Sequence, residues 1–226
     1  MKFWSQTAAI LMKDLLTEYR TKDVLTSMLL FGLLVILMFN FAFEPDSEEI
    51  RKFGPGLLWM TFIFAGLLGM NRSFSGEKEN DALEGLMLSP VNWSSIYLGK
   101  MLANLLFLLL AEAIILCLFS LLFNYGIWPR IGWMAAITFL GTLGFASVGT
   151  LLAAVSANTR MSEVMLPVLL VPLVLPVILS VVLATAANFA QPPEEPVMFF
   201  WMQVLAAYDI IFVTLPLMTF DYVLEK

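Results

Sequence analysis

Charged residues divide this chain into six long apolar runs. These runs cover residues 24–43, 53–71, 101–129, 131–159, 164–193 and 196–220, and only Glu112 and Asp209 interrupt them. A helix needs about 20 apolar residues to cross the hydrocarbon core of a bilayer, where it satisfies its own backbone hydrogen bonds. The pattern therefore predicts an all-α membrane protein with six transmembrane helices, over residues 24–43, 53–71, 101–123, 131–155, 164–189 and 197–220.

The composition excludes several other classes of protein. Only 13% of residues are charged, against about 25% in soluble domains, and the loops leave no room for a second, soluble domain. We therefore expect residues 1–226 to form a single transmembrane domain. With no histidine, one cysteine and no P-loop motif, we expect no catalytic residue, no metal site and no cofactor held covalently or by a P-loop. The net charge of −6 argues against nucleic-acid binding.

The distribution of basic residues predicts the orientation. Nine of the 12 Lys and Arg residues lie in segments on the same side as the N-terminus, whereas Arg51, Lys52 and Arg130 lie on the other side. Basic residues favour cytoplasmic loops, so a multi-pass topology with both termini cytoplasmic is predicted. The first apolar run is expected to be a retained span rather than a signal peptide.

Residues 2–22 precede the first span and are predicted to form an interfacial amphipathic helix. Trp4, Leu11 and Tyr19 fall on one side at helical spacing, and Lys13 and Arg20 on the other. Such a helix suits anionic headgroups of the lipid bilayer. Its role is either to anchor the first span or to contact a partner subunit.

The longest polar segment, residues 72–100, is predicted to be cytoplasmic and to contain a short helix. The helix has an apolar edge and an acidic edge, and it should end at Ser89, because Pro90 disfavours a helical conformation there. Helices that rest on membranes are usually basic, so an acidic one favours docking in a basic groove of a partner protein. The next helix is expected to begin near residues 92–95. The two edges consist of Leu83, Leu86 and Met87, and of Glu77, Glu79, Asp81 and Glu84.

Several motifs carry a family resemblance that extends over essentially the whole chain. Residues 77–90, followed by Ile96-Tyr97-Leu98-Gly99-Lys100, resemble the cytoplasmic loop of ABC-2-type permeases. More narrowly, they resemble the CcmB family, the haem exporter permeases of c-type cytochrome maturation. Further matching features are Gly54-Pro55-Gly56 with Trp59, Arg72, Arg160 in Asn158-Thr159-Arg160, and the C-terminal Phe-Asp-Tyr-Val-Leu-Glu.

The resemblance implies a transporter subunit of the bacterial inner membrane, not itself an enzyme. A separate CcmA-like ATPase subunit would hydrolyse ATP, and the short acidic helix would be the coupling helix. Further implied partners are CcmC- and CcmD-like membrane proteins, a CcmE-like haem chaperone and a second copy in a homodimer. Haem would be the cargo, or ATP would instead drive release of the loaded chaperone. Alternatives are an ABC-2 permease for a lipid-linked glycan or a drug, and a passive scaffold. The residues implied in coupling are Glu77, Glu79, Asp81, Leu83, Glu84, Leu86, Met87, Ser89 and Pro90.

Two carboxylates, Glu112 and Asp209, lie deep within predicted spans at a similar depth. Charged groups there are costly, so they should face the bundle interior. Three interpretations follow: protonated groups bonded to a neighbouring helix, a proton or substrate pathway, or a pair that shares one proton. The last would allow an intramembrane carboxylate enzyme.

Other residues predict helix geometry. Pro55 is expected in the first turn of the second span. Small residues recur every fourth position in the fourth span and predict close helix packing. Prolines in the fifth span predict bends. The small residues are Thr142, Ala146, Thr150 and Ala154, and the prolines are Pro167, Pro172 and Pro176.

Overall fold

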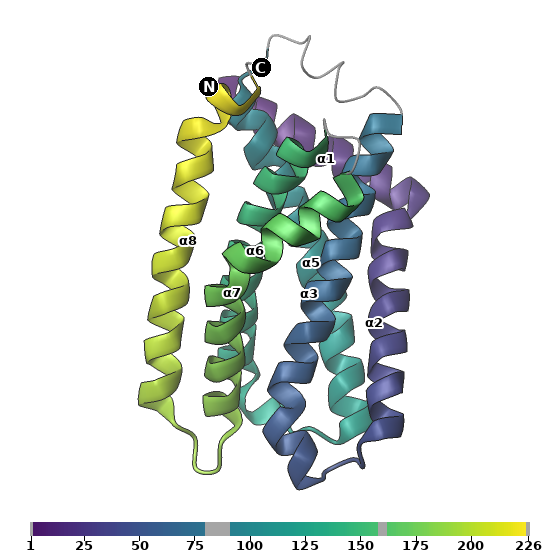
Figure 1. Cartoon of the computed structure of the whole chain (residues 1–226), viewed down its shortest axis with the longest axis vertical. Coiled ribbons are helices and arrows are strands. Elements are labelled where there is room, and N and C mark those ends of the chain that lie inside the picture. The colour runs from purple at the N-terminus through teal and green to yellow at the C-terminus, as the bar shows by residue number, and fades with distance from the viewer. Residues whose placement is uncertain (1, 80–90, 158–161, 225–226) are drawn as a thin grey trace.

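A computed structural model describes residues 2–79, 91–157 and 162–224, and no strand occurs in these ranges. Figure 1 shows an elongated bundle of long helices, with both ends of the chain at the same end of the bundle. The helices are α1 (Lys2–Thr21), α2 (Asp23–Ala42), α3 (Glu48–Glu79), α5 (Trp93–Phe123), α6 (Ile131–Ala157), α7 (Ser162–Phe189) and α8 (Glu195–Leu224), with a short 3₁₀ helix over Trp128–Arg130.

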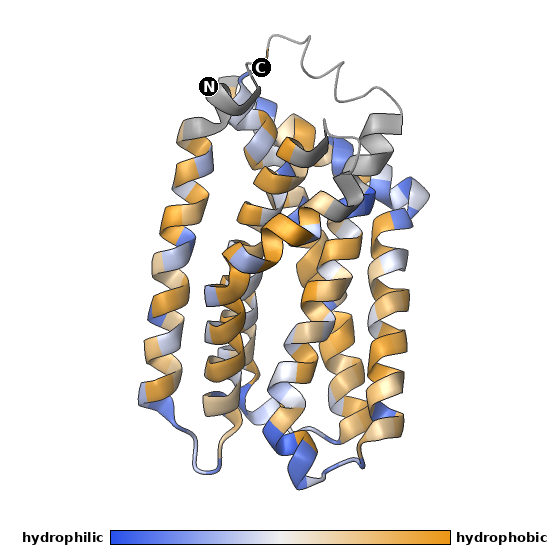
Figure 2. Cartoon of the chain, in the orientation of Figure 1, coloured by the Kyte–Doolittle hydropathy of each residue, from blue (hydrophilic) through white to orange (hydrophobic). Residues whose placement is uncertain are grey.

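Among the described residues, six helices are long and apolar enough to span a membrane, which confirms the predicted fold class. Hydrophobic residues occupy the middle of the bundle, and hydrophilic residues gather at its two ends (Figure 2). Large apolar side chains such as Leu34 and Phe41 on α2, and Ile210 on α8, remain exposed on the outside. An apolar exterior suits lipid rather than water, and the chain is a multi-pass membrane protein.

Helix α6 forms the centre of the bundle and packs against α3, α5, α7 and α8. The predicted stripe of small residues lies on it, and all four members are buried. Asn104 Nδ2 on α5 donates a hydrogen bond to Thr150 Oγ1 in this stripe, at 3.0 Å. The predicted close packing is confirmed, and the small side chains let polar groups of α5 reach α6.

Helix α1 packs across α5 at the end of the bundle where the two termini lie. A Cβ atom at Gly99 of α5 would lie 2.9 Å from Ile10 Cβ and 3.0 Å from the Thr7 carbonyl oxygen, so the two backbones approach closely. The side of α1 that packs on the bundle carries Thr7 and Ile10, whereas Trp4 and Tyr19 of the predicted apolar side stay exposed.

A sharp turn joins α1 to α2. Lys22 has a left-handed backbone (φ 58°), and the buried Glu18 carboxylate accepts hydrogen bonds from the Val24 and Leu25 N–H groups, at 3.3 and 2.8 Å. The carboxylate satisfies two of the donors that every helix N-terminus leaves free. It therefore fixes the direction in which α2 leaves α1.

Helix α3 begins earlier than the sequence predicted. Its first residue is Glu48, and Ser47 Oγ accepts a hydrogen bond from the Ile50 N–H at 3.3 Å. Pro55 therefore lies inside the helix rather than in its first turn. A serine cap followed by Glu48 and Glu49 stabilises the start of a helix. This stabilisation outweighs the hydrogen bond that Pro55, close to the same start, cannot make because it lacks an N–H.

Helix α7 contains all three predicted prolines, and Figure 1 shows that it changes direction between its first and second halves. Pro176 has no N–H for the carbonyl four residues earlier, which weakens the helix at this point. Tyr208 of α8 donates a hydrogen bond from its hydroxyl to the Leu173 carbonyl, at 3.0 Å. The bent region of α7 is therefore held by α8.

Candidate functional site

Much of the predicted coupling segment lies outside the described residues. This applies to Asp81, Leu83, Glu84, Leu86, Met87, Ser89 and Pro90, and also to Arg160. Glu77 and Glu79 form the last turn of α3, which extends beyond the predicted end of the second span at residue 71. The end of α3 and the start of α5 lie at the end of the bundle that holds both termini (Figure 1).

The start of α5, directly after this segment, is attached to two other helices. Asn92 caps α5 through a hydrogen bond that its side chain accepts from the Ser94 N–H, at 3.3 Å. Gln6 Oε1 of α1 accepts a bond from the Asn92 N–H at 3.4 Å, and Ser94 Oγ donates to the Leu217 carbonyl of α8 at 3.1 Å. The start of α5 is therefore joined to both α1 and α8.

An ionic cluster links α1 to α5. Asp14 Oδ1 lies 3.1 Å from Lys13 Nζ, and its Oδ2 lies 3.6 Å from Lys100 Nζ, a side chain that is almost fully buried. A buried ion pair costs desolvation, so it serves geometry better than stability. In the sequence, Lys100 counted as a basic residue for topology and as part of the family motif. Its pairing with Asp14 was not predicted, because nothing in the spacing of the two residues shows that the two helices cross.

Glu112 lies in the bundle interior, as predicted for a charged residue within a span. Thr142 Oγ1 on α6 lies 2.6 Å from Glu112 Oε2 and 2.7 Å from the Thr138 carbonyl oxygen. A hydroxyl has one proton to donate. If Thr142 donates it to Glu112, the carboxyl accepts the bond; if Thr142 donates it to the Thr138 carbonyl, Glu112 has to carry a proton for the contact to be a hydrogen bond. In both arrangements the Glu112 side chain is bonded to a neighbouring helix.

Asp209 on α8 is also buried, and it also reaches α6. A Cβ atom at Gly144 would lie 2.7 Å from Asp209 Oδ1. Within the described part of the chain neither carboxylate oxygen has a hydrogen-bond partner. Thr142 and Gly144 are about 3 Å apart along the helix axis, which matches the predicted similar depth. They point to different sides of α6, since positions i and i+2 do not share a face. The geometry therefore argues against a carboxylate pair that shares one proton.

Among the motif residues of the second span, Trp59 and Gly54 contact neighbouring parts of the bundle. Trp59 is buried, and its Nε1 donates a hydrogen bond to Thr185 Oγ1 of α7, at 2.9 Å. A Cβ atom at Gly54 would lie 3.2 Å from the Tyr125 ring, whereas one at Gly56 would meet no atom within 4 Å. Arg72 is exposed on α3. Trp59 thus joins α3 to α7, and Gly54 makes room for the loop after α5.

A very small internal cavity lies beside Trp59, Glu112 and Thr142. Its volume is about 10 Å³, and it is enclosed by α3, α5, α6 and α7. That is about the space of one water molecule. The cavity is too small for a transported molecule, so in this conformation it forms no substrate pathway.

Comparison with known proteins places these features in a family. The family model described as "CcmB protein" matches residues 5–224, nearly the whole chain. The chain belongs to the CcmB family. Three CcmB-family relatives carry the name heme exporter protein B. They are from Rhodobacter capsulatus (27% identical; 71% of this chain and 73% of the relative), Haemophilus influenzae (30%; 70% and 71%) and Escherichia coli (28%; 46% and 46%).

The resemblance inferred from the motifs is thereby confirmed over nearly the whole length. In the comparison with Escherichia coli, the matched region spans less than half of that relative. The family match identifies a membrane subunit, and the roles of particular residues have to be argued from the structure.

Proposed function

We propose that this chain is the permease subunit of an ABC transporter complex for haem export, or for release of a haem-loaded chaperone, in cytochrome c biogenesis. The observation that carries the proposal is the CcmB match over residues 5–224 on a bundle with six helices long enough to span a membrane. The relatives' name, heme exporter protein B, supports haem as the cargo. The family match also favours a transporter subunit over a catalytic enzyme.

We further propose that a separate CcmA-like ATPase docks on residues 77–90, on the cytoplasmic side of the bacterial inner membrane. The attachment of the next residues supports this mechanism, because Asn92 and Ser94 bond to Gln6 of α1 and to the Leu217 carbonyl of α8. A push on this segment would reach three helices at once. CcmC- and CcmD-like membrane proteins, a CcmE-like chaperone and a second copy of this chain would complete the assembly.

The test is co-purification of the complete chain with its candidate ATPase from detergent. The test variant combines Glu79→Gln, Asp81→Asn and Glu84→Gln. The matched control combines Glu44→Gln, Glu49→Gln and Glu194→Gln, which removes the same charge at the opposite end of the bundle. We expect the test variant to lose the ATPase and the control to keep it.

Four other outcomes would contradict parts of the proposal. Equal recovery of the ATPase with both variants would refute docking on the acidic segment. Stimulation of the ATPase by a lipid-linked glycan or a drug, with none by haem or its chaperone, would favour the alternative cargo. A chain that stays active without the ATPase would point to an intramembrane enzyme, and assembly that needs no ATP hydrolysis would point to a passive scaffold.

A further inference from the structure

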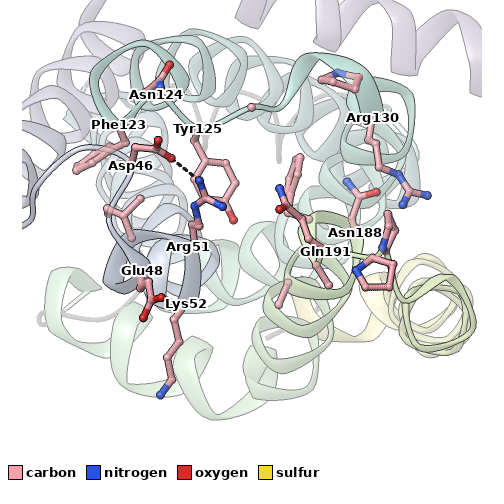
Figure 3. A pocket seen from close by; sticks show the side chains of 18 residues that line it. Asp46, Glu48, Arg51, Lys52, Phe123, Asn124, Tyr125, Arg130, Asn188 and Gln191 are labelled. Atoms are coloured by element: carbon pink, nitrogen blue, oxygen red, sulfur yellow. Dashed lines mark hydrogen bonds and ion pairs between the residues drawn. The ribbon is translucent and has the colours of Figure 1, made fainter.

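A large pocket opens at the end of the bundle opposite the two termini. Its volume is about 930 Å³, and three loop regions surround it: the start of α3, the segment between α5 and α6, and the turn between α7 and α8. Figure 3 shows the side chains that converge on it. The volume lies in the upper range of small-molecule sites. The pocket is far larger than the cavity beside Glu112.

The pocket collects the three basic residues that the topology places on the outer side, Arg51, Lys52 and Arg130. Arg51 Nη2 lies 2.7 Å from Asp46 Oδ1, and Arg130 Nη2 lies 2.9 Å from Glu195 Oε1. A guanidinium has five N–H donors, so each arginine keeps donors for a ligand.

Lys52 has no carboxylate within ion-pair distance among residues 2–79, 91–157 and 162–224, and its Nζ lies 5.4 Å from the centroid of the Phe53 ring. Asp46 and Glu48 also line the pocket and Glu195 pairs with Arg130, so carboxylates balance its three cations. The donors left for a ligand with negative groups are the Lys52 ammonium and the guanidinium N–H groups outside the ion pairs.

The rest of the wall is largely apolar. Phe123, Tyr125 and Phe189 contribute rings, and the Tyr125 ring packs edge-on against Phe189 at a centroid distance of 5.2 Å. Pro129, Pro192 and Pro193 add rigid apolar surface. Rings and prolines of this kind bind a flat apolar body with little loss of side-chain freedom.

Asn188 is the residue that most directly indicates a ligand with polar groups. It lies at the end of α7, lines the pocket and has no exposed surface. Its Nδ2 and Oδ1 have no hydrogen-bond partner among the residues that the structure describes. Burying an amide without partners is costly, and such groups are retained where something else bonds to them. In Figure 3, the amide lies between Gln191 and Arg130.

We propose that this pocket binds an amphiphilic anion, an apolar body with oxyanion groups, and that this ligand is the tetrapyrrole cargo. Arg130, Lys52 and Arg51 would hold the two carboxylates, Asn188 would donate to one of them, and Tyr125 and its neighbours would contact the ring. The assignment of the tetrapyrrole rests on the proposed function. The other source of the same chemistry is the headgroup of an anionic phospholipid from the surrounding leaflet.

The test is a haem titration of the purified chain in detergent, followed by absorbance. The test variant is Lys52→Gln with Arg130→Gln, and the matched control is Arg20→Gln with Lys22→Gln at the other end of the bundle. We expect haem affinity to fall at least tenfold in the test variant and to stay within twofold in the control. Protoporphyrin dimethyl ester, which lacks the two carboxylates, should bind the native chain at least tenfold more weakly than protoporphyrin does.

Asn188→Leu separates a binding role from a structural one. Removal of an unpaired buried amide should raise the melting temperature of the ligand-free chain, while haem affinity falls. Equal haem affinity in all variants would overturn the proposal. Loss of bound phosphatidylglycerol from the test variant, with haem affinity unchanged, would assign the pocket to lipid instead. Either result would leave the ATPase co-purification untouched, so the two proposals can fail separately.

Discussion

The contact between α1 and α5 gives the sharpest prediction, made by comparing two glycines. Gly99→Ala places a Cβ atom 2.9 Å from Ile10 Cβ and 3.0 Å from the Thr7 carbonyl oxygen. Gly56→Ala is the control, because its Cβ atom meets nothing within 4 Å. Both residues lie inside long helices, so alanine brings each the same gain of about 0.5–1 kcal/mol in helix propensity.

The magnitude follows from the geometry. Carbon atoms rest about 3.5–4.0 Å apart, so α1 has to move away from α5 by roughly 0.6–1 Å. Neither obstacle is the flexible end of a side chain, and overpacking of this kind costs about 1–3 kcal/mol. Gly56→Ala should therefore be stabilised, and Gly99→Ala should be about 1–3 kcal/mol less stable than Gly56→Ala.

The assay is thermal unfolding in detergent, followed by intrinsic tryptophan fluorescence. With about 2–4 °C for each kcal/mol in a chain of this size, Gly56→Ala should melt about 1–4 °C above the native chain. Gly99→Ala should melt at least about 2 °C below Gly56→Ala. It should also weaken coupling to the ATPase, because α1 holds Asn92 through Gln6. Equal stabilisation by both alanines would refute the close packing of α1 on α5.

Three further predictions test other contacts. Trp59→Phe and Thr185→Val should each destabilise the chain by about 1 kcal/mol, because each removes the same hydrogen bond. In a double-mutant cycle of melting temperatures, the double variant should therefore lose less stability than the sum of the two single variants. Glu112→Gln should keep the proposed ATP-driven activity within about twofold, since an amide can keep the bond to Thr142 as donor or as acceptor; a large loss would instead indicate a proton pathway. Burial raises the pKa of Tyr125 to about 12, above its ordinary value of about 10, so the folded chain resists ionisation there. The free energy of unfolding should therefore fall as pH rises from about 10 to about 12, and this fall should be smaller in Tyr125→Phe.

The six membrane helices could be predicted from sequence because a long uncharged run has few alternatives to a membrane helix. The small residues of α6 were also predictable, because their spacing of four defines one helix face. Two features could not be foreseen in this way. Pro55 lies inside α3 because the Ser47 cap begins the helix earlier, a signal that is present in the sequence but competes with the proline.

The second feature that could not be predicted is the set of contacts between helices that are distant in sequence. Glu112 was predicted to face the interior, but its bond to Thr142 depends on how α5 and α6 are rotated. The same holds for Asp14 with Lys100, and for the gathering of Arg51 and Arg130 around one pocket. No local pattern encodes such encounters, because they arise from the packing of complete helices.

The attachment of α8 at both ends has a mechanical consequence. Its 30 residues form a rod about 45 Å long. One end is fixed to Ser94 through the Leu217 carbonyl, and Tyr208 couples its middle to the bent part of α7. The far end leads into the turn whose Gln191, Pro192 and Pro193 line the large pocket. With the Leu217 contact as a pivot, a tilt of about 5° would swing the first residue of α8, about 33 Å away, by about 3 Å. A displacement at the Ser94 end of α8 would thus change the width of the pocket at the opposite end of the bundle, without any change in helix length.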